Sequence, residues 1–195
     1  MAPRRGNTTE SILLERFDSG CQGVCIGWII FEEVGEYSGP TELSRVIDVD
    51  AAPVIYAGTV YSISARGNLV AIELQTGRLL WKRKYSSYRQ LAVTSDTIYL
   101  TNVKGHVYAV DRVNGLEKWS QLSLTNRTVT GPALTDKYLV VGDYEGYLHW
   151  IDRQSGEIVS RYNIDGSGVY ATPTVKNNIL YVQSRDGDLE AIATP

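Results

Sequence analysis

The sequence has few cysteines and histidines, no long apolar run and no excess of positive charge, and each shortage excludes a class of protein. Two cysteines, Cys21 and Cys25, and two distant histidines cannot supply an evident four-ligand zinc site. No stretch approaches the ~18 uncharged apolar residues of a membrane-spanning helix. A net charge of −3 offers no basic face for nucleic acid. We therefore expect a globular chain that needs no metal, no cofactor and no nucleic acid.

The sequence is instead rich in tyrosine and in regularly spaced glycine. Thirteen tyrosines against two phenylalanines are typical of half-exposed strands. A glycine followed by a strand-like run and a second turn recurs with a period of 38, then 41, then 41 residues. The copies begin at Gly67, Gly105, Gly146 and Gly187. A period near 40 built from short strands is typical of β-propeller blades. The sequence thus predicts an all-β fold, a partial β-propeller of about four four-stranded blades.

Each copy divides into expected strands separated by turns. A first strand begins near a proline that lies fourteen residues before the repeat glycine, because proline is tolerated at strand starts and edges. These prolines are Pro53, Pro132 and Pro173, and Leu91 takes the place in the second copy. The second strands are expected at Val60–Ser64, Ile98–Asn102, Leu139–Asp143 and Ile179–Ser184. The repeat glycine then closes a short hairpin to the third strand.

The fourth strand of a blade ends in tryptophan in the first two copies. We expect Trp81 and Trp119 to wedge between neighbouring sheets, where a large area is buried. Ser160 stands at this place in the third copy and predicts a looser contact between two blades. The fourth copy stops at Pro195, before its fourth strand, so we expect an open blade whose edge needs a partner strand.

The first 36 residues do not keep the period. We interpret residues 1–36 as the remnant of a disrupted blade, with a true N-terminal extension as the alternative. Residues 37–195 then form the partial propeller, with blades at approximately 37–86, 87–124, 125–164 and 165–195. A further hypothesis is that Ile29–Val34 supplies the missing fourth strand of the terminal blade.

Several polar residues have ordinary structural interpretations. Ser19-Gly20-Cys21 resembles a lipoprotein cleavage box, but charged residues interrupt the apolar segment that a signal peptide requires. His106 and His149 take nearly equivalent places after a repeat glycine, which favours a structural slot. Asp111 and Asp152 precede turns, where carboxylates usually accept hydrogen bonds from turn amides. None of these patterns predicts catalysis, and we expect that the chain is not an enzyme.

Asp48 and Asp50 are more informative. Alternate residues of an extended segment point to the same side, and this pair lies just before the first blade. One interpretation is a solvated loop with turn-forming aspartates. A second is an acidic patch that receives Arg or Lys from a protein partner. A third is a calcium site, for which further oxygen ligands are not evident.

The repeat as a whole resembles the quinoprotein-type propeller repeat, and two segments are more specific. The segment from Gly39 to Asp50, followed by Pro53, and the segment from Val140 to Trp150 are similar to the BamB family of outer-membrane assembly proteins. The resemblance covers residues 37–195 and corresponds to the C-terminal half of an eight-bladed ring.

This resemblance implies a non-catalytic scaffold on the periplasmic face of the outer membrane, which binds the periplasmic POTRA domains of BamA and assists insertion of β-barrel clients. Asp48 and Asp50 match an Asp-x-Asp segment that the family uses for partner binding. Arg5 is the candidate for an arginine in a second, Leu-x-Leu-Arg-Gly segment, although Pro3 and Arg4 depart from that pattern. The chain shows no recognisable signal peptide or lipid-anchor box.

Two other interpretations stay open at the level of sequence. The chain could be a fragment of a quinoprotein dehydrogenase, but such enzymes need a quinone, a metal and a catalytic Asp, and often have adjacent cysteines that are absent here. Alternatively, the chain is a defective product whose exposed flanks invite aggregation or dimerisation into a full ring.

Overall fold

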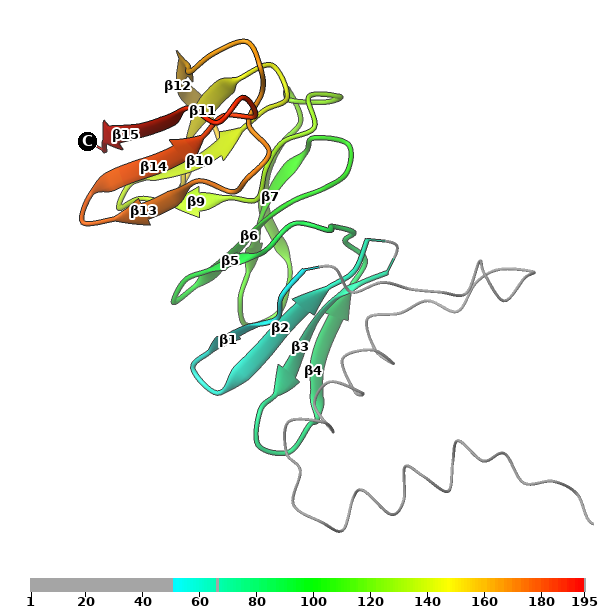
Figure 1. Cartoon of the computed structure of the whole chain (residues 1–195). Helices are drawn as coiled ribbons and strands as arrows, with labels where there is room; N and C mark the ends of the chain where they lie inside the picture. Colours follow the sequence, from blue (N-terminus) through cyan, green and yellow to red (C-terminus); the bar gives the residue numbers. More distant parts are fainter. Residues whose placement is uncertain (1–50, 66, 195) are drawn as a thin grey trace, which may run out of the picture.

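The computed structural model describes residues 51–65 and 67–194, and their regular structure consists of fifteen β-strands (Figure 1). The strands form three four-stranded sheets and one three-stranded sheet, all antiparallel. None of the described segments forms a long apolar helix of the kind that crosses a bilayer. The all-β fold predicted from the repeats is confirmed.

Each sheet is one blade, and its strands follow in chain order from one edge to the other. Blade 1 contains β1 (Val54–Tyr56), β2 (Thr59–Ile63), β3 (Leu69–Glu73) and β4 (Leu79–Arg83). Blade 2 contains β5 (Ala92–Val93), β6 (Thr97–Thr101), β7 (Val107–Asp111) and β8 (Glu117–Gln121). Blade 3 contains β9 (Ala133–Leu134), β10 (Tyr138–Gly142), β11 (Tyr147–Asp152) and β12 (Ile158–Asn163). Blade 4 contains β13 (Thr174–Lys176), β14 (Ile179–Gln183) and β15 (Leu189–Ala193).

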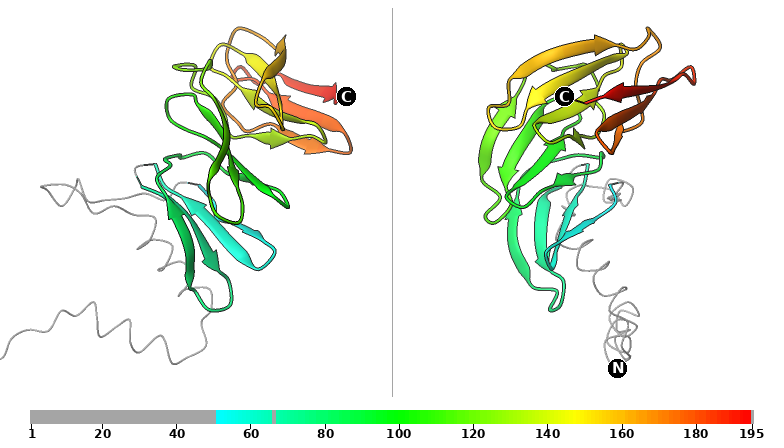
Figure 2. Two further views of the ribbon diagram at one scale, coloured as in Figure 1. Left: turned by 180° about the vertical axis from the view of Figure 1, so that it is seen from behind. Right: turned by 90° about the vertical axis from the view of Figure 1, so that its left-hand side faces the viewer.

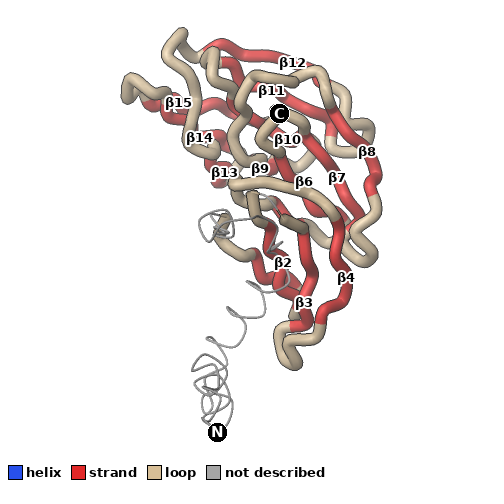
Figure 3. Tube along the Cα trace, turned by 90° about the vertical axis from the view of Figure 1, so that its right-hand side faces the viewer, coloured by secondary structure: helices blue, strands red, loops and turns tan. Residues whose placement is uncertain are grey.

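The four blades follow one another along a curved row (Figures 1 and 2). The short first strands lie on one side of the row, and the fourth strands β4, β8 and β12 lie along the opposite margin (Figure 3). This arrangement is the partial propeller that the period predicted. The blade limits given in the sequence analysis, and the separate status of residues 1–36, stay predictions.

Tight turns set the register inside the blades. Ala57 and Gly58, between β1 and β2, both have positive φ, which is the backbone of a hairpin turn that matches the strand twist. Asn177 and Asn178 have the same backbone between β13 and β14. Glycine and asparagine are residue types that tolerate this left-handed backbone.

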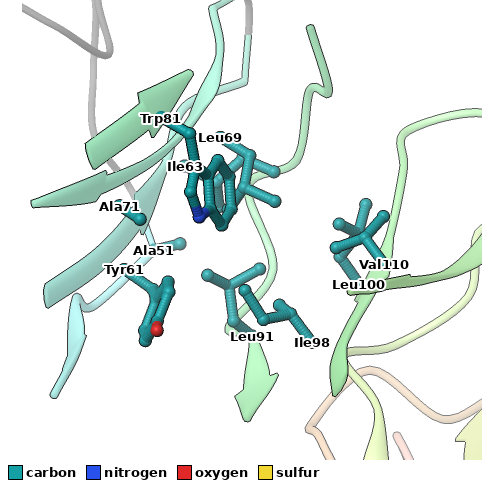
Figure 4. Packing of buried hydrophobic residues seen from close by; sticks show 10 residues of the cluster. All are labelled: Ala51, Tyr61, Ile63, Leu69, Ala71, Trp81, Leu91, Ile98, Leu100 and Val110. Atoms are coloured by element: carbon teal, nitrogen blue, oxygen red, sulfur yellow. The ribbon is translucent and has the colours of Figure 1, made fainter. Parts of the chain in front are cut away.

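Apolar residues from adjacent blades meet face to face and form the core between them. Ile63 and Leu69 of blade 1 pack against Ile98 and Leu100 of blade 2 (Figure 4), and all four side chains are 0–1% exposed. Equivalent clusters lie between blades 2 and 3 and between blades 3 and 4. Because each core needs two blades, the packing that stabilises one blade is supplied by its neighbours.

The predicted tryptophan wedges are confirmed at the first two junctions. The Nε1 atom of Trp81 donates a hydrogen bond to the carbonyl of Arg112 in the next blade at 3.2 Å. Trp119 donates likewise to the carbonyl of Arg153 at 3.0 Å. Each indole thus buries its ring between two blades and satisfies its one polar atom there.

At the third junction, the tryptophan and the small residue that faces it have exchanged strands. Trp81 and Trp119 sit opposite alanine in the neighbouring strand, at Ala71 and Ala109, whereas Ser160 sits opposite Trp150. The indole has therefore moved from the fourth strand to the third. A cavity of about 300 Å³ lies beside Ser160, lined also by Tyr138, Trp150 and Val159. All four lining residues belong to blade 3, and the looser contact between blades that was expected at Ser160 stays a prediction.

Blade 4 has an exposed outer face. Tyr181 and Leu189 are 38% and 71% exposed, whereas the residues at the same repeat places in blade 1, Tyr61 and Leu69, are 1% and 0% exposed. The described part of blade 4 has three strands, so the outer edge of β15 carries no paired strand.

Candidate partner-binding face

The residues predicted to bind a partner, Arg5, Asp48 and Asp50, lie outside the described residues. The same is true of Cys21, Cys25 and the hypothetical fourth strand Ile29–Val34. The description begins at Ala51, directly after the acidic pair, and Ala51 is buried in the core between blades 1 and 2. The described residues at the corresponding places of the later repeats therefore indicate where the acidic pair is expected.

The segments that join successive blades meet the hairpins between second and third strands at one end of each blade. The amide of Asn126 in the second connection donates to the carbonyl of Lys104 in the preceding hairpin at 2.8 Å. The amide of Tyr144 in the next hairpin donates to the carbonyl of Arg127 at 3.1 Å. We call this end the connection face, formed by connections 84–91, 122–132 and 164–173 and by the described residues of the hairpins, 64–65, 67–68, 102–106, 143–146 and 184–188.

The place of Asp48 in the repeat can be compared with that of residues which the structure describes. It precedes Pro53 by five residues, as Arg127 precedes Pro132 and Gly168 precedes Pro173. Arg127 and Gly168 both lie on the connection face. The repeat therefore predicts that the acidic pair belongs to the same face.

A buried carboxylate anchors the connection face of blade 3. The Oδ2 atom of Asp143 lies 2.6 Å from a terminal guanidinium nitrogen of Arg127 and 2.8 Å from Nε2 of His149. Its Oδ1 atom accepts the amides of Glu145 and Tyr147. Asp143 and His149 are 0% and 1% exposed. Both oxygens are thus satisfied, as a buried charge requires.

These contacts decide the charge state of Asp143. Burial alone would raise the pKa of its carboxyl group, but the hydrogen bonds from His149, from the amide of Tyr147 and from Arg127 outweigh burial and lower the pKa below its usual value. The same ion pair, extended by Glu145, raises the pKa of Arg127. The cluster ties the connection between blades 2 and 3 to the hairpin of blade 3.

The two histidines do not share a slot, and the near-equivalence expected from sequence is wrong. His149 lies inside β11 and reaches the buried Asp143. His106 lies before β7, half-buried, and contacts the hydroxyl groups of Tyr108 and Thr125 at 3.1 Å. The residue three places after Gly105, where His149 stands after Gly146, is Tyr108. The two histidines stand one and three residues after their repeat glycines, so they are two repeat places apart, and only His149 lies within a strand.

A second polar cluster lies on blade 2. The rings of Tyr85 and Tyr108 meet edge to face at 5.3 Å between centroids, and the hydroxyl of Tyr85 lies 3.5 Å from Glu117. Burial and the neighbouring carboxylate raise the pKa of Tyr85 to about 12. These phenols are therefore neutral hydrogen-bonding groups at physiological pH.

Asp111 and Asp152 have the structural role that the sequence predicted. The Oδ1 atom of Asp111 accepts the amides of Val113 and Asn114. The Oδ1 atom of Asp152 accepts the amides of the two corresponding turn residues. Within residues 51–65 and 67–194, no three His, Cys, Asp or Glu side chains are grouped so that they could hold a metal ion.

Comparison with solved structures first defines the class of protein. BamB from Moraxella catarrhalis superimposes with a TM-score of 0.75 and 32% identity over 81% of this chain and 47% of that chain. Quinohemoprotein alcohol dehydrogenase from Comamonas testosteroni superimposes with a TM-score of 0.58 at 18% identity, covering 70% of this chain and 29% of that chain, which shows the fold alone. The chain has the fold of part of a β-propeller.

The sequence then identifies the family. The family model described as outer membrane protein assembly factor BamB matches residues 32–121 and 115–194. The BamB of Shewanella oneidensis is 46% identical over 158 residues, which cover 81% of this chain and 40% of that relative. The chain belongs to the BamB family and spans less than half the length of this relative.

Proposed function

We propose that the chain is a non-catalytic scaffold of outer-membrane β-barrel assembly and acts on the periplasmic face of the outer membrane. The observation that carries this proposal is its membership of a family whose relatives are named outer membrane protein assembly factors. The described residues contribute polar side chains mainly to turns and to contacts between blades. A platform with this architecture presents loops to other polypeptides.

The proposed partner is the periplasmic POTRA region of BamA, bound through Asp48 and Asp50. Two like charges beside one connection would attract Arg or Lys side chains and fix the orientation of the partner. Arg5 is proposed as a further contact. Unfolded β-barrel clients are proposed as a second class of partner, which would use an open strand edge.

The experiment is a calorimetric titration of the 195-residue chain and its Asp48→Arg variant with purified BamA periplasmic domains. We expect Asp48→Arg to weaken binding by roughly 1–3 kcal/mol, because a charge-assisted contact is replaced by repulsion. Asp136→Arg is the matched control, since Asp136 is exposed in the turn before β10 and its side chain makes no hydrogen bond or ion pair in the described residues. Equal affinity of wild type and Asp48→Arg, with both folded, would remove the proposed role.

A further inference from the structure

Two arginines and three tyrosines gather on the connection face. A terminal nitrogen of Arg89, in the connection before blade 2, donates to the carbonyl of Tyr170, in the connection before blade 4, at 3.2 Å. The guanidinium carbon of Arg185 lies 5.6 Å from the centre of the Tyr170 ring. Tyr88 and Tyr144 complete the group, which we call the arginine–tyrosine patch.

The patch exposes aromatic surface. Tyr144 and Tyr170 are 52% and 39% exposed, and their rings meet edge to face at 5.9 Å. Arg89 lies over the ring of Tyr88 at 4.7 Å. A cavity of about 420 Å³ adjoins Tyr170 and Arg185. Tyrosine and arginine are enriched among the residues that contribute most binding energy in protein interfaces.

Both arginines lack a carboxylate partner. Arg127 pairs with Asp143 and Glu145, but no carboxylate of the described residues lies within 4.0 Å of Arg89 or Arg185. The buried Nε atom of Arg89 has no hydrogen-bond partner. Guanidinium groups stacked on aromatic rings are partly desolvated and are best satisfied by carboxylates, which accept two N–H groups at once.

We propose that the arginine–tyrosine patch binds an acidic, extended segment of a partner polypeptide. The inference deepens the proposed function and rests on it, because it adds a second contact to the face assigned to Asp48 and Asp50. The two contacts have opposite charge. A matching partner would place basic residues at the acidic pair and acidic residues at the patch. In the reversed orientation, like charges would repel each other at both places.

The charges favour a polypeptide over an anionic membrane surface. Recognition of anionic lipids typically uses clusters of four to eight basic residues. The patch has two arginines, in a chain whose net charge is −3. Two guanidinium groups flanked by rings match alternating acidic and apolar side chains, because alternate residues of an extended segment share a side.

The test measures fluorescence anisotropy of a labelled eight-residue peptide of alternating Glu and Leu, titrated with the full chain. A peptide with Gln in place of Glu is the uncharged control ligand. We expect the Glu peptide to bind at least tenfold more tightly than the Gln peptide, and 0.5 M salt to remove most of the difference. The double variant Arg89→Gln/Arg185→Gln should lose at least tenfold in affinity for the Glu peptide.

Two further variants keep the result interpretable. Arg185→Gln alone removes a side chain that makes no hydrogen bond in the described residues, so the variant should fold normally. Its affinity for the Glu peptide should fall at least threefold. Lys137→Gln/Arg161→Gln removes the same charge from exposed sites outside the patch and should change affinity by less than twofold. Equal losses in both double variants, or equal binding of the two peptides, would overturn the proposal.

A lipid outcome is tested separately with vesicles of phosphatidylglycerol and phosphatidylcholine. Vesicle binding that needs Arg89 and Arg185, without binding of the Glu peptide, would overturn the polypeptide assignment. BamA is absent from both assays, so these results are independent of the Asp48→Arg titration. The Glu peptide can therefore bind even if Asp48→Arg leaves BamA binding unchanged, and BamA binding can depend on Asp48 even if the peptide does not bind.

Discussion

Asp143 is a single residue that joins three parts of the molecule. Its carboxylate accepts hydrogen bonds from Arg127 in the connection, from His149 in β11 and from two backbone amides, one in its own hairpin and one at the start of β11. A carboxylate at this place in the hairpin was visible in the sequence only as part of an expected strand. Neither Arg127 nor His149 could be assigned to it, because the contact depends on how the connection folds back over the blade.

Replacement of Asp143 by Asn should destabilise the fold by about 3 kcal/mol at pH 7, because a buried ion pair loses one partner. Since the folded-state pKa of Asp143 is lowered, its contribution is present above the ordinary carboxyl pKa of 3.8 and is lost as pH falls through the folded-state value. The stability difference between wild type and Asp143→Asn should therefore shrink in acid. Urea unfolding between pH 3 and pH 7 measures both effects.

Asp136→Asn is the control for this series, because Asp136 is exposed. It should change stability by no more than about 0.5 kcal/mol at any pH in the range. A pH-independent loss in Asp143→Asn would show that shape, and not charge, explains the role of Asp143.

At the scale of elements, two hairpin glycines allow the hairpin of one blade to lie close to the connection that leads to the next blade. Gly105 and Gly146 have positive φ, and a Cβ atom at either would lie 2.2 Å or 1.8 Å from the backbone oxygen of Leu124 or Asp165 in the following connection. Glycine is needed there for the turn and also for the close approach of another segment. The sequence period revealed the first need, whereas the second depends on the path of the connection.

Gly146→Ala and Gly187→Ala separate these two needs. Gly187 also has positive φ, but no atom lies within 4 Å of its would-be Cβ. We expect Gly187→Ala to cost about 1–2 kcal/mol through backbone strain alone. Gly146→Ala should cost at least about 2 kcal/mol more, because the connection must move. Equal losses in chemical denaturation would show that the connection adapts freely.

At the scale of the whole molecule, burial is unequal along the row of blades. All five residues of β6 are buried, whereas residues of β14 alternate between buried and exposed. A blade with neighbours on both sides has two packed faces, and the described blade 4 has one. Local opening should therefore be easier at the blade 4 end of the row.

Hydrogen exchange followed by mass spectrometry on the 195-residue chain measures this gradient. We expect amides of β14 and β15 to exchange at least tenfold faster than those of β6 and β7 in the same sample. Uniform protection across the four blades would mean that the chain opens only as one unit, or that blade 4 is covered in solution.

The sequence predicted the fold well because the period reports a local property, the spacing of turns. It predicted the candidate site less completely. Tyr144 and Arg185 take the same place in successive repeats, two residues before the repeat glycine, but Arg89 comes from a connection and no repeat place marks it as their neighbour. Tyr170 and Arg89 are brought together by the curvature of the row, which no single repeat encodes.

The exchange of Trp150 and Ser160 has a consequence for how such chains are compared. If each repeat position is scored by itself, blade 3 loses its tryptophan and looks degenerate. If the two facing positions of the third and fourth strands are scored together, each of the first three blades has one indole opposite one small residue. Alignments of this family should therefore be searched for covariation between these two columns, because a loss in one column can be compensated in the other.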